Sequence, residues 1–458
     1  MVILAVKYCA PHGSAGRWQN ILRPTGESTP PGDRAGGPAA QGESFTITID
    51  DLRGKKVYIE SYGCTYNNAD ARRLAAILEG LGCTLTGPDE ADAVIVNTCT
   101  VIGATERKML RRLALFAGRD LYVTGCMPLV QMELIRSVCT PRVILPAEIQ
   151  ERSDGVGSRG AGAIGVVQVA SGCVGRCSYC ITRLARGRLV SAPPEAILDA
   201  VRRLVASGAY EIQLTGQDVA AWGLDRGESL PDLLQAIAEI PGRFSVRLGM
   251  MHPASVLGIL EPLVDACTSD KIFRFLHLPA QSGSDAVLER MQRGYRAADV
   301  IRIVDAFREQ YPDMMISSDF ITGFPGETDE DFRQTLDLLR RAAFVKVNVT
   351  RYSRRPGTPA AALKDLPERV RKVRSRALLA EADRIYDRYN ERWMGRETSI
   401  VATEKNAPSS TVCRNPCYLN VIVKEDLPLG FSGRAVITEN RRHYVVGEPV
   451  PPGTGHRV

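Results

Sequence analysis

Three closely spaced cysteines form the segment of this chain best suited to bind a redox-active metal cluster. Cys173, Cys177 and Cys180 stand in a Cys-x₃-Cys-x₂-Cys arrangement directly after an apolar run. Three thiolates at this spacing can bind a [4Fe–4S] cluster and leave its fourth iron open to a substrate. The alternative is a zinc site with a distant fourth ligand, but structural zinc sites usually pair two Cys-x₂-Cys elements, and none completes this one. We therefore expect an iron–sulfur cluster with one open iron.

Three further cysteines are far apart in sequence but share one position relative to the predicted strands. Cys64, Cys99 and Cys126 each come just after a short apolar strand. The carboxyl ends of neighbouring parallel strands line one crevice, so these thiols should meet despite separations of 35 and 27 residues. Burial as small core residues is the alternative, since free cysteine is commonly buried. Three strand ends in register favour a second cluster.

The other six cysteines show no comparable pattern. Cys413 and Cys417 have the spacing of half a metal site, but no second half is visible, and we interpret the pair as structural. The remaining four are interpreted as residues of the core or of an N-terminal extension: Cys9, Cys83, Cys139 and Cys267.

The elements around these cysteines alternate between short apolar strands and helices. Strands at 55–61, 93–97 and 121–125 are each followed by a helical stretch, which is typical of a parallel sheet with helices on its faces. After a Gly- and Ser-rich linker at 153–165, six further strands alternate with helices up to about residue 365. This longer series predicts a partial or full β/α barrel.

Both ends of the chain differ from this α/β pattern. Residues 1–52 are rich in Gly, Pro, Ser and Arg, which predicts a disordered extension. A helix at 367–394 leads to short strands separated by Gly and Pro, which predicts a small all-β barrel. The expected domains are an extension (1–52), an open parallel α/β sheet (53–153), a β/α-barrel core (160–392) and a β barrel (393–455).

Composition narrows the class of protein. With 44% hydrophobic and 24% charged residues, the chain has the composition of a globular protein with ample core. It shows no apolar run long enough to span a bilayer and no signal-peptide pattern, so we expect a cytoplasmic protein without a membrane partner, and a monomer by default. Cysteines in that compartment stay reduced and are available as metal ligands. The net charge of +6 indicates a nucleic-acid partner only if the charge is concentrated.

The first cysteine motif, including the aromatic Tyr179, resembles that of the radical S-adenosylmethionine (SAM) superfamily. Leu214–Asp218 and Asp319–Thr328 resemble strand ends that contact SAM in that superfamily. The resemblance implies that the open iron chelates the methionine group of SAM and that the reduced cluster cleaves SAM to a 5′-deoxyadenosyl radical. It also implies an external electron donor, such as a ferredoxin or flavodoxin. The residues it implicates in SAM binding are Thr215, Gly216, Gln217, Asp319 and Gly323.

The strand-end cysteines carry a second resemblance, to the N-terminal domain of the methylthiotransferases, which hold two [4Fe–4S] clusters. The segments that carry it are Tyr62-Gly-Cys64 with Asn67, Val96-Asn-Thr-Cys99-Thr-Val, and Gly125-Cys126. It implies that one SAM methylates sulfur at the auxiliary cluster, the one expected on the strand-end cysteines. A second SAM then supplies the radical that opens a substrate C–H bond. Two clusters are needed because the sulfur must be held close to the carbon it attacks.

The basic residues favour RNA as the substrate. Residues 369–376 (RVRKVRSR) contain five basic and no acidic side chains, just before the predicted small barrel. A basic helix beside a small β barrel is typical of phosphate-backbone binding, although a solvated helix face is the alternative. The terminal segment resembles the TRAM domain, an RNA-binding barrel. The expected RNA-binding residues are Arg369, Arg371, Lys372, Arg374 and Arg434.

Three stretches favour one branch of the family: 182–187 (TRLARG), 247–250 (RLGM) and 355–359 (RPGTP). They resemble the archaeal and eukaryotic enzymes, which methylthiolate C2 of N6-threonylcarbamoyladenosine 37 beside the anticodon. The resemblance therefore implies a tRNA anticodon stem-loop as partner. The alternatives are the same chemistry on N6-isopentenyladenosine in tRNA or on a ribosomal-protein aspartate, and a non-catalytic iron–sulfur RNA-binding protein.

Overall fold

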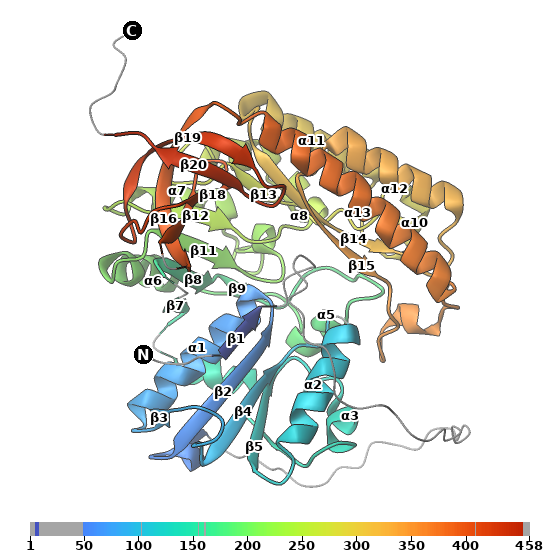
Figure 1. Ribbon diagram of the computed structural model, residues 1–458. Coiled ribbons are helices and arrows are strands. Elements are labelled where there is room, and N and C mark those ends of the chain that lie inside the picture. Colours follow the sequence, from blue (N-terminus) through green and yellow to red (C-terminus); the bar gives the residue numbers. More distant parts are fainter. Residues whose placement is uncertain are drawn as a thin grey trace.

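The computed structural model describes residues 5–8, 49–101, 103–153, 155–159, 162–407 and 409–451, which form three parts (Figure 1). An N-terminal α/β sheet lies at one end, and a central β/α part and a C-terminal β barrel lie together at the other. No helix within these ranges is long and apolar enough to cross a membrane.

The N-terminal part is a parallel sheet with helices on both faces. Its strands are β1 (Ala5–Tyr8), β2 (Lys56–Gly63), β3 (Thr84–Leu85), β4 (Ala93–Thr98), β5 (Asp120–Gly125) and β6 (Arg142–Val143). Its helices are α1 (Thr65–Gly80), α2 (Gly103–Leu115), α3 (Met132–Arg136) and α4 (Pro146–Arg152). The strand order is β1-β2-β4-β5-β6, with β3 also beside β2. Ile59 and Ile95 pack with α1 on one face, and Val94 and Val96 pack with α2 on the other. This agrees with the open parallel sheet expected from the sequence.

The structure describes two short segments of the expected N-terminal extension. Ala5–Tyr8 pairs in parallel with β2. The 3₁₀ turn η1 (Ile49–Leu52) buries Ile49 and Leu52 in the core beside α1. Two apolar residues in a single turn are too few to show a periodicity, which is why the sequence pattern begins later. The rest of the expected extension lies outside the described residues.

The central part is an open β/α barrel. Its parallel strands are β8 (Ile164–Gln168), β11 (Glu211–Thr215), β12 (Ser245–Leu248), β13 (Phe275–His277), β14 (Met315–Thr322) and β15 (Lys346–Arg351). They follow one another in that order, and a parallel bridge between Met250 and His277 joins the sheet of β12 to that of β13. Within the described residues β8 pairs with β7 and not with β15, so the barrel is partial.

Helices cover the outside of this barrel (Figure 1). They are α6 (Pro194–Ala206), η2 (Val219–Ala221), α7 (Leu230–Glu239), α8 (Pro253–Leu257), α9 (Leu260–Ala266), α10 (Asp285–Arg290), α11 (Ala297–Gln310), α12 (Asp329–Ala342) and η3 (Pro359–Ala362). All six strands expected from the sequence are present.

The segment expected as a linker is partly structured. β7 (Gly157–Arg159) pairs antiparallel with β8, which itself begins at Ile164. A Cβ at Gly165 would lie 3.0 Å from the side chains of Ile212 and Leu204. This glycine therefore permits close packing of α6 against the sheet, whereas the composition of the segment indicates only flexibility.

The C-terminal part begins with the long helix α13 (Glu368–Glu391) and ends in a closed five-stranded barrel. The barrel strands are β16 (Glu397–Ala407), β17 (Ser410–Arg414), β18 (Asn420–Val423), β19 (Ser432–Asn440) and β20 (Val445–Pro449), in the order β16-β17-β18-β20-β19. The sequence pattern missed β17, which is short and carries Cys413. Cys413 and Cys417 are both buried in the barrel core, where each packs as a small apolar side chain.

Candidate active site

The structure brings the ends of β2, β4 and β5 together, and with them Cys64, Cys99 and Cys126. Ser61 pairs with Asn97, and Thr98 pairs with Gly125, so the three strands end side by side. Cys64 is the N-cap residue of α1, and the other two cysteines directly follow β4 and β5. The Cys126 N–H donates to the Thr98 carbonyl at 3.0 Å.

Two buried asparagines hold these strand ends in place. The Asn67 amide donates to the carbonyls of Tyr62 (2.6 Å) and Thr98 (3.1 Å). The Asn97 amide donates to the Asn67 carbonyl (2.6 Å) and to the Ser61 hydroxyl (3.0 Å). These buried amides satisfy buried acceptors and tie together the strand ends that carry the cysteines.

Cys173, Cys177 and Cys180 lie in one loop, between β9 (Ala170–Ser171) and α5 (Ile181–Arg186). After α5, β10 (Val190–Ser191) returns to pair with β9, which closes the loop. Ser178 anchors it to α10, through its N–H to the Met291 carbonyl (2.9 Å) and its hydroxyl to the Arg290 carbonyl (2.8 Å). Burial raises the pKa of Cys173 to about 11.

A buried arginine that sequence reasoning did not single out lies against this loop. Arg293 donates to the Cys177 sulfur at 3.2 Å and to the Tyr179 hydroxyl at 3.4 Å. Its other nitrogens donate to the Pro279 carbonyl and the Tyr295 hydroxyl. Arg293 has no spacing relation to the cysteines, so nothing in the sequence pattern marks it.

The expected SAM-binding residues after β11 do reach the cysteine loop. The Gln217 side-chain oxygen accepts the Gly172 N–H at 2.7 Å, next to Cys173. Thr215 is buried at the end of β11, and its carbonyl accepts the Val169 N–H at 2.9 Å. Gly216 is buried beside Ala170, whose carbonyl oxygen would lie 3.2 Å from a Cβ there. These residues lie beside the cysteine loop and also help to hold it in position.

Asp319, also expected at the SAM site, lies on β14 beside two polar partners. His277 Nε2 is 3.1 Å from one carboxylate oxygen, and the Asn348 amide donates to the other at 2.7 Å. Burial raises the pKa of Asp319, but His277 and Asn348 outweigh it and hold this pKa below its ordinary value. The carboxylate is thus kept charged on β14.

Gly323 does not face an open site. Its N–H is bound by the Glu327 carboxylate, at 3.0 and 3.1 Å, and a Cβ there would overlap the Arg371 side chain. The close approach that this glycine permits is to α13. The sequence-based assignment of Gly323 to the cofactor site is therefore not supported by its surroundings.

The loop of Cys173, Cys177 and Cys180 leaves space beside its thiols. A Cβ at Gly175 would lie 3.3 Å from the Cys173 sulfur and 3.7 Å from the Cys177 sulfur, so a side chain there would occupy the space between the thiols. No three His, Cys, Asp or Glu side chains in the described ranges converge as they would around a single metal ion. A [4Fe–4S] cluster, in contrast, is held by thiolates on separate irons. The residues present fit that group.

Helix α5 connects the two cysteine sets. Cys180 is its N-cap, and Arg186, its last residue, donates to the Cys126 sulfur at 3.3 Å. Six helical residues advance by only about 9 Å. Helix α5 and the Arg186 side chain thus link the two cysteine sets at the junction of the N-terminal and central parts.

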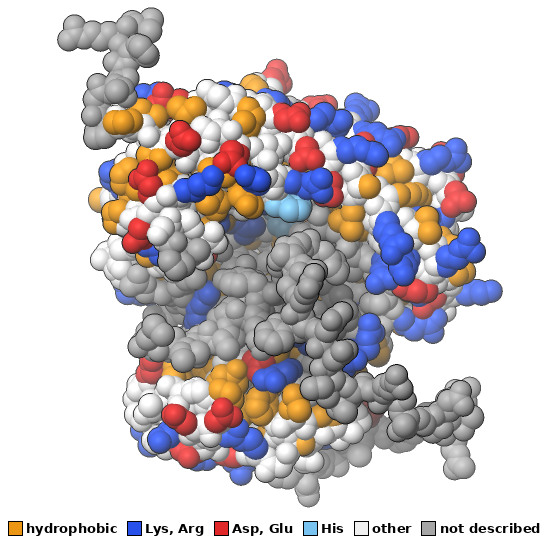
Figure 2. Space-filling model, viewed as in Figure 1, with side chains coloured by type: hydrophobic (Ala, Val, Ile, Leu, Met, Phe, Trp, Pro, Cys, Tyr) orange, Lys and Arg blue, Asp and Glu red, His pale blue; other side chains and the backbone are white. Residues whose placement is uncertain are grey.

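The expected RNA-binding residues have different environments. Arg374 is buried and pairs with Glu327 (2.6 Å) and Asp329 (2.7 Å), so its expected RNA-binding role is wrong for a physical reason: its donors are already used inside the fold. Arg371 is half-buried and donates to the Tyr352 carbonyl. Three others are exposed: Arg369, Lys372 and Arg434. Figure 2 shows basic side chains gathered over the surface where Figure 1 places α12 and α13.

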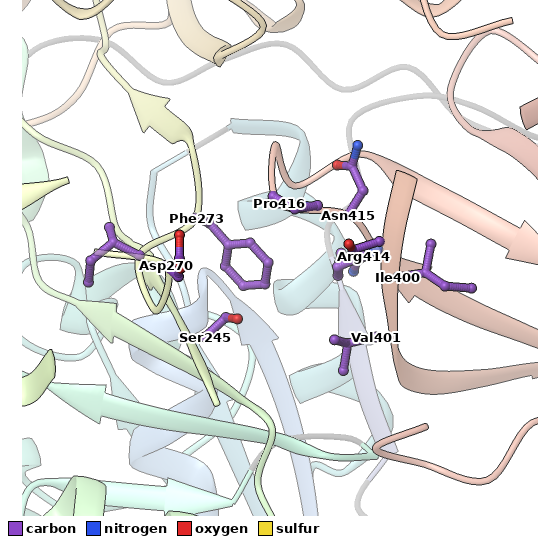
Figure 3. Close-up of a pocket in the computed structure, with 10 residues that line it drawn as sticks. Ser245, Asp270, Phe273, Ile400, Val401, Arg414, Asn415 and Pro416 are labelled. Atoms are coloured by element: carbon purple, nitrogen blue, oxygen red, sulfur yellow. The ribbon is translucent and has the colours of Figure 1, made fainter. Parts of the chain in front are cut away.

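A small pocket of about 60 Å³ lies elsewhere, between the central part and the C-terminal barrel. Figure 3 shows Asp270 and Phe273 on one side of it and Arg414, Ile400 and Val401 on the other. Ser245, the first residue of β12, also lines it, so it lies at the opposite strand ends from the cysteines. It has no part in the candidate site.

Family models match both cysteine-bearing parts of the chain. Residues 167–339 match the radical SAM superfamily, and residues 56–143 match an uncharacterized protein family, UPF0004. Among solved structures, the radical SAM methyltransferase TsrM from Kitasatospora setae is similar at 17% identity and a TM-score of 0.46, covering 67% of this chain and 76% of that one.

Curated relatives match over most of their length. A probable threonylcarbamoyladenosine tRNA methylthiotransferase of Methanothermobacter thermautotrophicus is 38% identical over 83% of this chain and 96% of its own. One of Archaeoglobus fulgidus with the same name is 36% identical over 86% and 98%. A threonylcarbamoyladenosine tRNA methylthiotransferase of Xenopus laevis is 34% identical over 86% and 77%.

Proposed function

The chain belongs to the family of threonylcarbamoyladenosine tRNA methylthiotransferases, and we propose that it methylthiolates C2 of N6-threonylcarbamoyladenosine 37 in tRNA. It is a radical SAM enzyme, with an iron–sulfur cluster and SAM as cofactors. The finer proposal is that it holds two [4Fe–4S] clusters, one on Cys173, Cys177 and Cys180 and an auxiliary one on Cys64, Cys99 and Cys126.

One observation carries the two-cluster proposal: the short helix α5 ends one cysteine loop and contacts a cysteine of the other set. The Arg186–Cys126 contact at 3.3 Å joins segments 60 residues apart in sequence. A methylthio group can be transferred only if the sulfur lies near the carbon radical. Adjacent cysteine sets meet that requirement, whereas a single cluster used only for electron transfer would not need the second set.

Cys173, Cys177 and Cys180 would hold the [4Fe–4S] cluster, which when bound would supply the electron for the reductive cleavage of SAM. The chain's own residues prepare that step. Gln217 holds the backbone of the cysteine loop through the Gly172 N–H, and Ser178 ties the loop to α10. Arg293 places a positive charge beside the Cys177 sulfur. Asp319, kept ionised by His277 and Asn348, offers an acceptor on β14 for a hydroxyl or amino group of a ligand.

The C-terminal barrel is proposed to be a TRAM domain that binds the tRNA anticodon stem-loop together with α13. The exposed Arg369, Lys372 and Arg434 are the candidates for phosphate contacts. The domain proposal is then 49–153 for the methylthiotransferase domain, 157–392 for the radical SAM core and 393–451 for the barrel. A tRNA substrate and reduced thiols support a cytoplasmic location. We also propose a reduced ferredoxin or flavodoxin as the electron donor, and a monomeric protein.

Nucleoside mass spectrometry tests the substrate. A strain that lacks the gene should lose the 2-methylthio derivative of N6-threonylcarbamoyladenosine and regain it with the wild-type gene but not with a Cys177→Ala variant. An unchanged peak would refute the proposal. Loss of the 2-methylthio derivative of isopentenyladenosine instead would move the same chemistry to the other tRNA substrate.

Iron analysis tests the auxiliary cluster separately. The reconstituted wild-type protein should hold about eight irons per chain, and Cys64→Ala should hold about four while still releasing 5′-deoxyadenosine. Cys83→Ala is the matched control, because Cys83 is buried in the same domain away from the strand ends. An iron count that Cys64→Ala leaves unchanged would contradict the second cluster.

A further inference from the structure

Arg186 is a buried cation at the auxiliary cysteine set. Its side chain is only 3% exposed. Nε donates to the Cys126 sulfur, and Nη2 donates to Asp70 at 2.8 Å and to Asn67 at 3.1 Å. Nη1 is buried and has no acceptor within the described residues. Arg186 belongs to the central part of the chain, yet all three partners belong to the N-terminal sheet domain.

Arg355 approaches the same cysteine set from another side. It lies in the loop after β15, its side chain is 5% exposed, and Nη1 pairs with Glu106 of α2 at 2.7 Å. Its Nη2 would lie 3.4 Å from a Cβ at Gly103, the first residue of α2, and the guanidinium is close enough to Cys99 for an electrostatic interaction. Nε and Nη2 are buried without an acceptor in the part of the chain that the structure describes.

Buried N–H groups without acceptors are rare, because each loses its hydrogen bonds to water and gains none in return. Arginine also stays charged, so it cannot escape this cost by losing a proton. Three such nitrogens, one on Arg186 and two on Arg355, lie beside one cysteine set. An anionic group bound beside the cysteines could accept hydrogen bonds from these nitrogens, which have no acceptor among the described residues.

A [4Fe–4S] cluster bound by three thiolates is such an acceptor, since its net charge is negative and its sulfur atoms accept hydrogen bonds. We propose that Arg186 and Arg355 donate hydrogen bonds to the sulfur atoms of the auxiliary cluster and thereby raise its reduction potential. This inference rests on the proposed function, because it needs that cluster. The direction follows from charge: a nearby cation and N–H···S bonds stabilise the reduced, more negative state.

The proposal divides the auxiliary site between two parts of the chain. The N-terminal domain supplies the thiolates of Cys64, Cys99 and Cys126, and the central part supplies the two cations. The potential of the auxiliary cluster then depends on how the parts dock, through the ion pairs Arg186–Asp70 and Arg355–Glu106. Both arginines act as positioning and tuning residues for the cluster.

The test uses the full chain with Cys173, Cys177 and Cys180 all changed to Ala, so that only the auxiliary cluster remains. On this background, Arg355→Gln and the double variant Arg186→Gln/Asp70→Asn are reconstituted, and their potentials are measured by EPR-monitored titration. The Asp70 change avoids leaving a buried carboxylate unpaired. Arg188→Gln is the control, since Arg188 is exposed and two residues beyond Arg186.

We expect each variant to keep about four irons and to shift its one-electron reduction equilibrium by at least tenfold toward the oxidised state. That shift corresponds to about 59 mV more negative. Arg188→Gln should not shift it. Unchanged potentials in both test variants, or an equal shift in the control, would overturn the inference.

Loss of iron from a protein has a defined consequence for the inference. If the double variant loses its iron, the Arg186→Lys variant is measured in its place. Lysine keeps the positive charge but lacks the planar guanidinium with its several N–H donors. A reduction potential equal to that of the parent protein would then overturn the role of Arg186. If the parent protein itself binds no iron, the auxiliary cluster and hence the proposed function fail, which is distinct from failure of the arginine contacts.

Discussion

At the scale of single residues, Gly63 determines how closely β2 can approach Cys99. Its φ is +117°, which is unfavourable for residues with a Cβ, and a Cβ there would lie 2.9 Å from that of Cys99. The residue therefore meets two independent requirements, backbone conformation and close contact. It stands directly before Cys64, so it belongs to the surroundings of the proposed auxiliary site without being a proposed ligand.

We predict that Gly63→Ala lowers the iron content from about eight to about four per chain, because the added methyl group displaces Cys99 or Cys64. Gly82→Ala is the matched control: Gly82 also has a positive φ, +77°, but a Cβ there would meet no atom within 4 Å. Both variants should lose roughly 1 kcal/mol or more of stability from backbone strain. Equal iron contents in the two variants would show that the contact with Cys99 is unimportant.

At the scale of elements, α13 has a buried side and an exposed side. Its buried side packs on the central part, with Arg374 inserted against Glu327 and Asp329 at the start of α12. Burial raises the pKa of Glu327, and Arg374 opposes this. Its exposed side carries Arg369 and Lys372. Arg374 thus serves stability, whereas Lys372 and Arg369, two and five positions before it on the same basic segment, are exposed and proposed for RNA binding.

We predict that Arg374→Ala destabilises the protein by about 3–5 kcal/mol, because it leaves Glu327 buried and unpaired. The matched variant Arg369→Ala should leave the unfolding temperature unchanged and weaken tRNA binding, with a reduced salt dependence of affinity. Calorimetry and filter binding over a range of salt measure the two effects. A lower unfolding temperature for Arg369→Ala than for Arg374→Ala would contradict this division.

At the scale of the whole molecule, a polar network joins the central barrel to the C-terminal barrel. The Tyr418 hydroxyl donates to Glu211 at 2.7 Å, and Arg414 pairs with Glu404 at 3.1 Å. The Lys346 ammonium lies 5.7 Å from the centre of the Tyr418 ring. Burial, then the charges of Arg414 and Arg247, lower the pKa of Lys346 to about 7.

This pKa makes stability depend on pH. The unfolded chain binds the Lys346 proton below about pH 10.5, but the folded chain binds it only below about 7, so protonation favours unfolding between these values. The Lys346 contribution to stability therefore rises with pH, by at most about 1.4 kcal/mol per unit. We predict that Lys346→Met raises the unfolding temperature most at pH 7 and progressively less toward pH 10.

The exposed Lys372→Met variant is the control, because it removes a lysine without removing a buried charge. It should show the pH dependence of the wild type. A stabilisation by Lys346→Met that is equal at pH 7 and pH 10 would exclude this lysine as the cause.

The sequence alone determined where the cysteines stand relative to the strands. Both motifs are local: one depends on a seven-residue loop, and the other on short apolar strands that each end just before a cysteine. Parallel pairing then brings those ends together, so the candidate ligands, the α/β order and the terminal β barrel could all be predicted. The boundary at residue 49 and β7 were missed because each element is too short to show a period. β17 was also missed, although it is as long as strands that were predicted.

Only the tertiary structure decided which charged residues serve the site. Arg186 meets Asp70 across 116 positions, and Arg355 meets Glu106 across 249. Arg374, in a run that reads as a basic surface, is instead buried, and Gly323 contacts a helix rather than a cofactor. The composition and residue spacing of a sequence carry information about residues that are close along the chain. Burial and ion pairing depend on contacts made only when distant segments pack, and those contacts determine whether a charge faces solvent, another charge or a cluster.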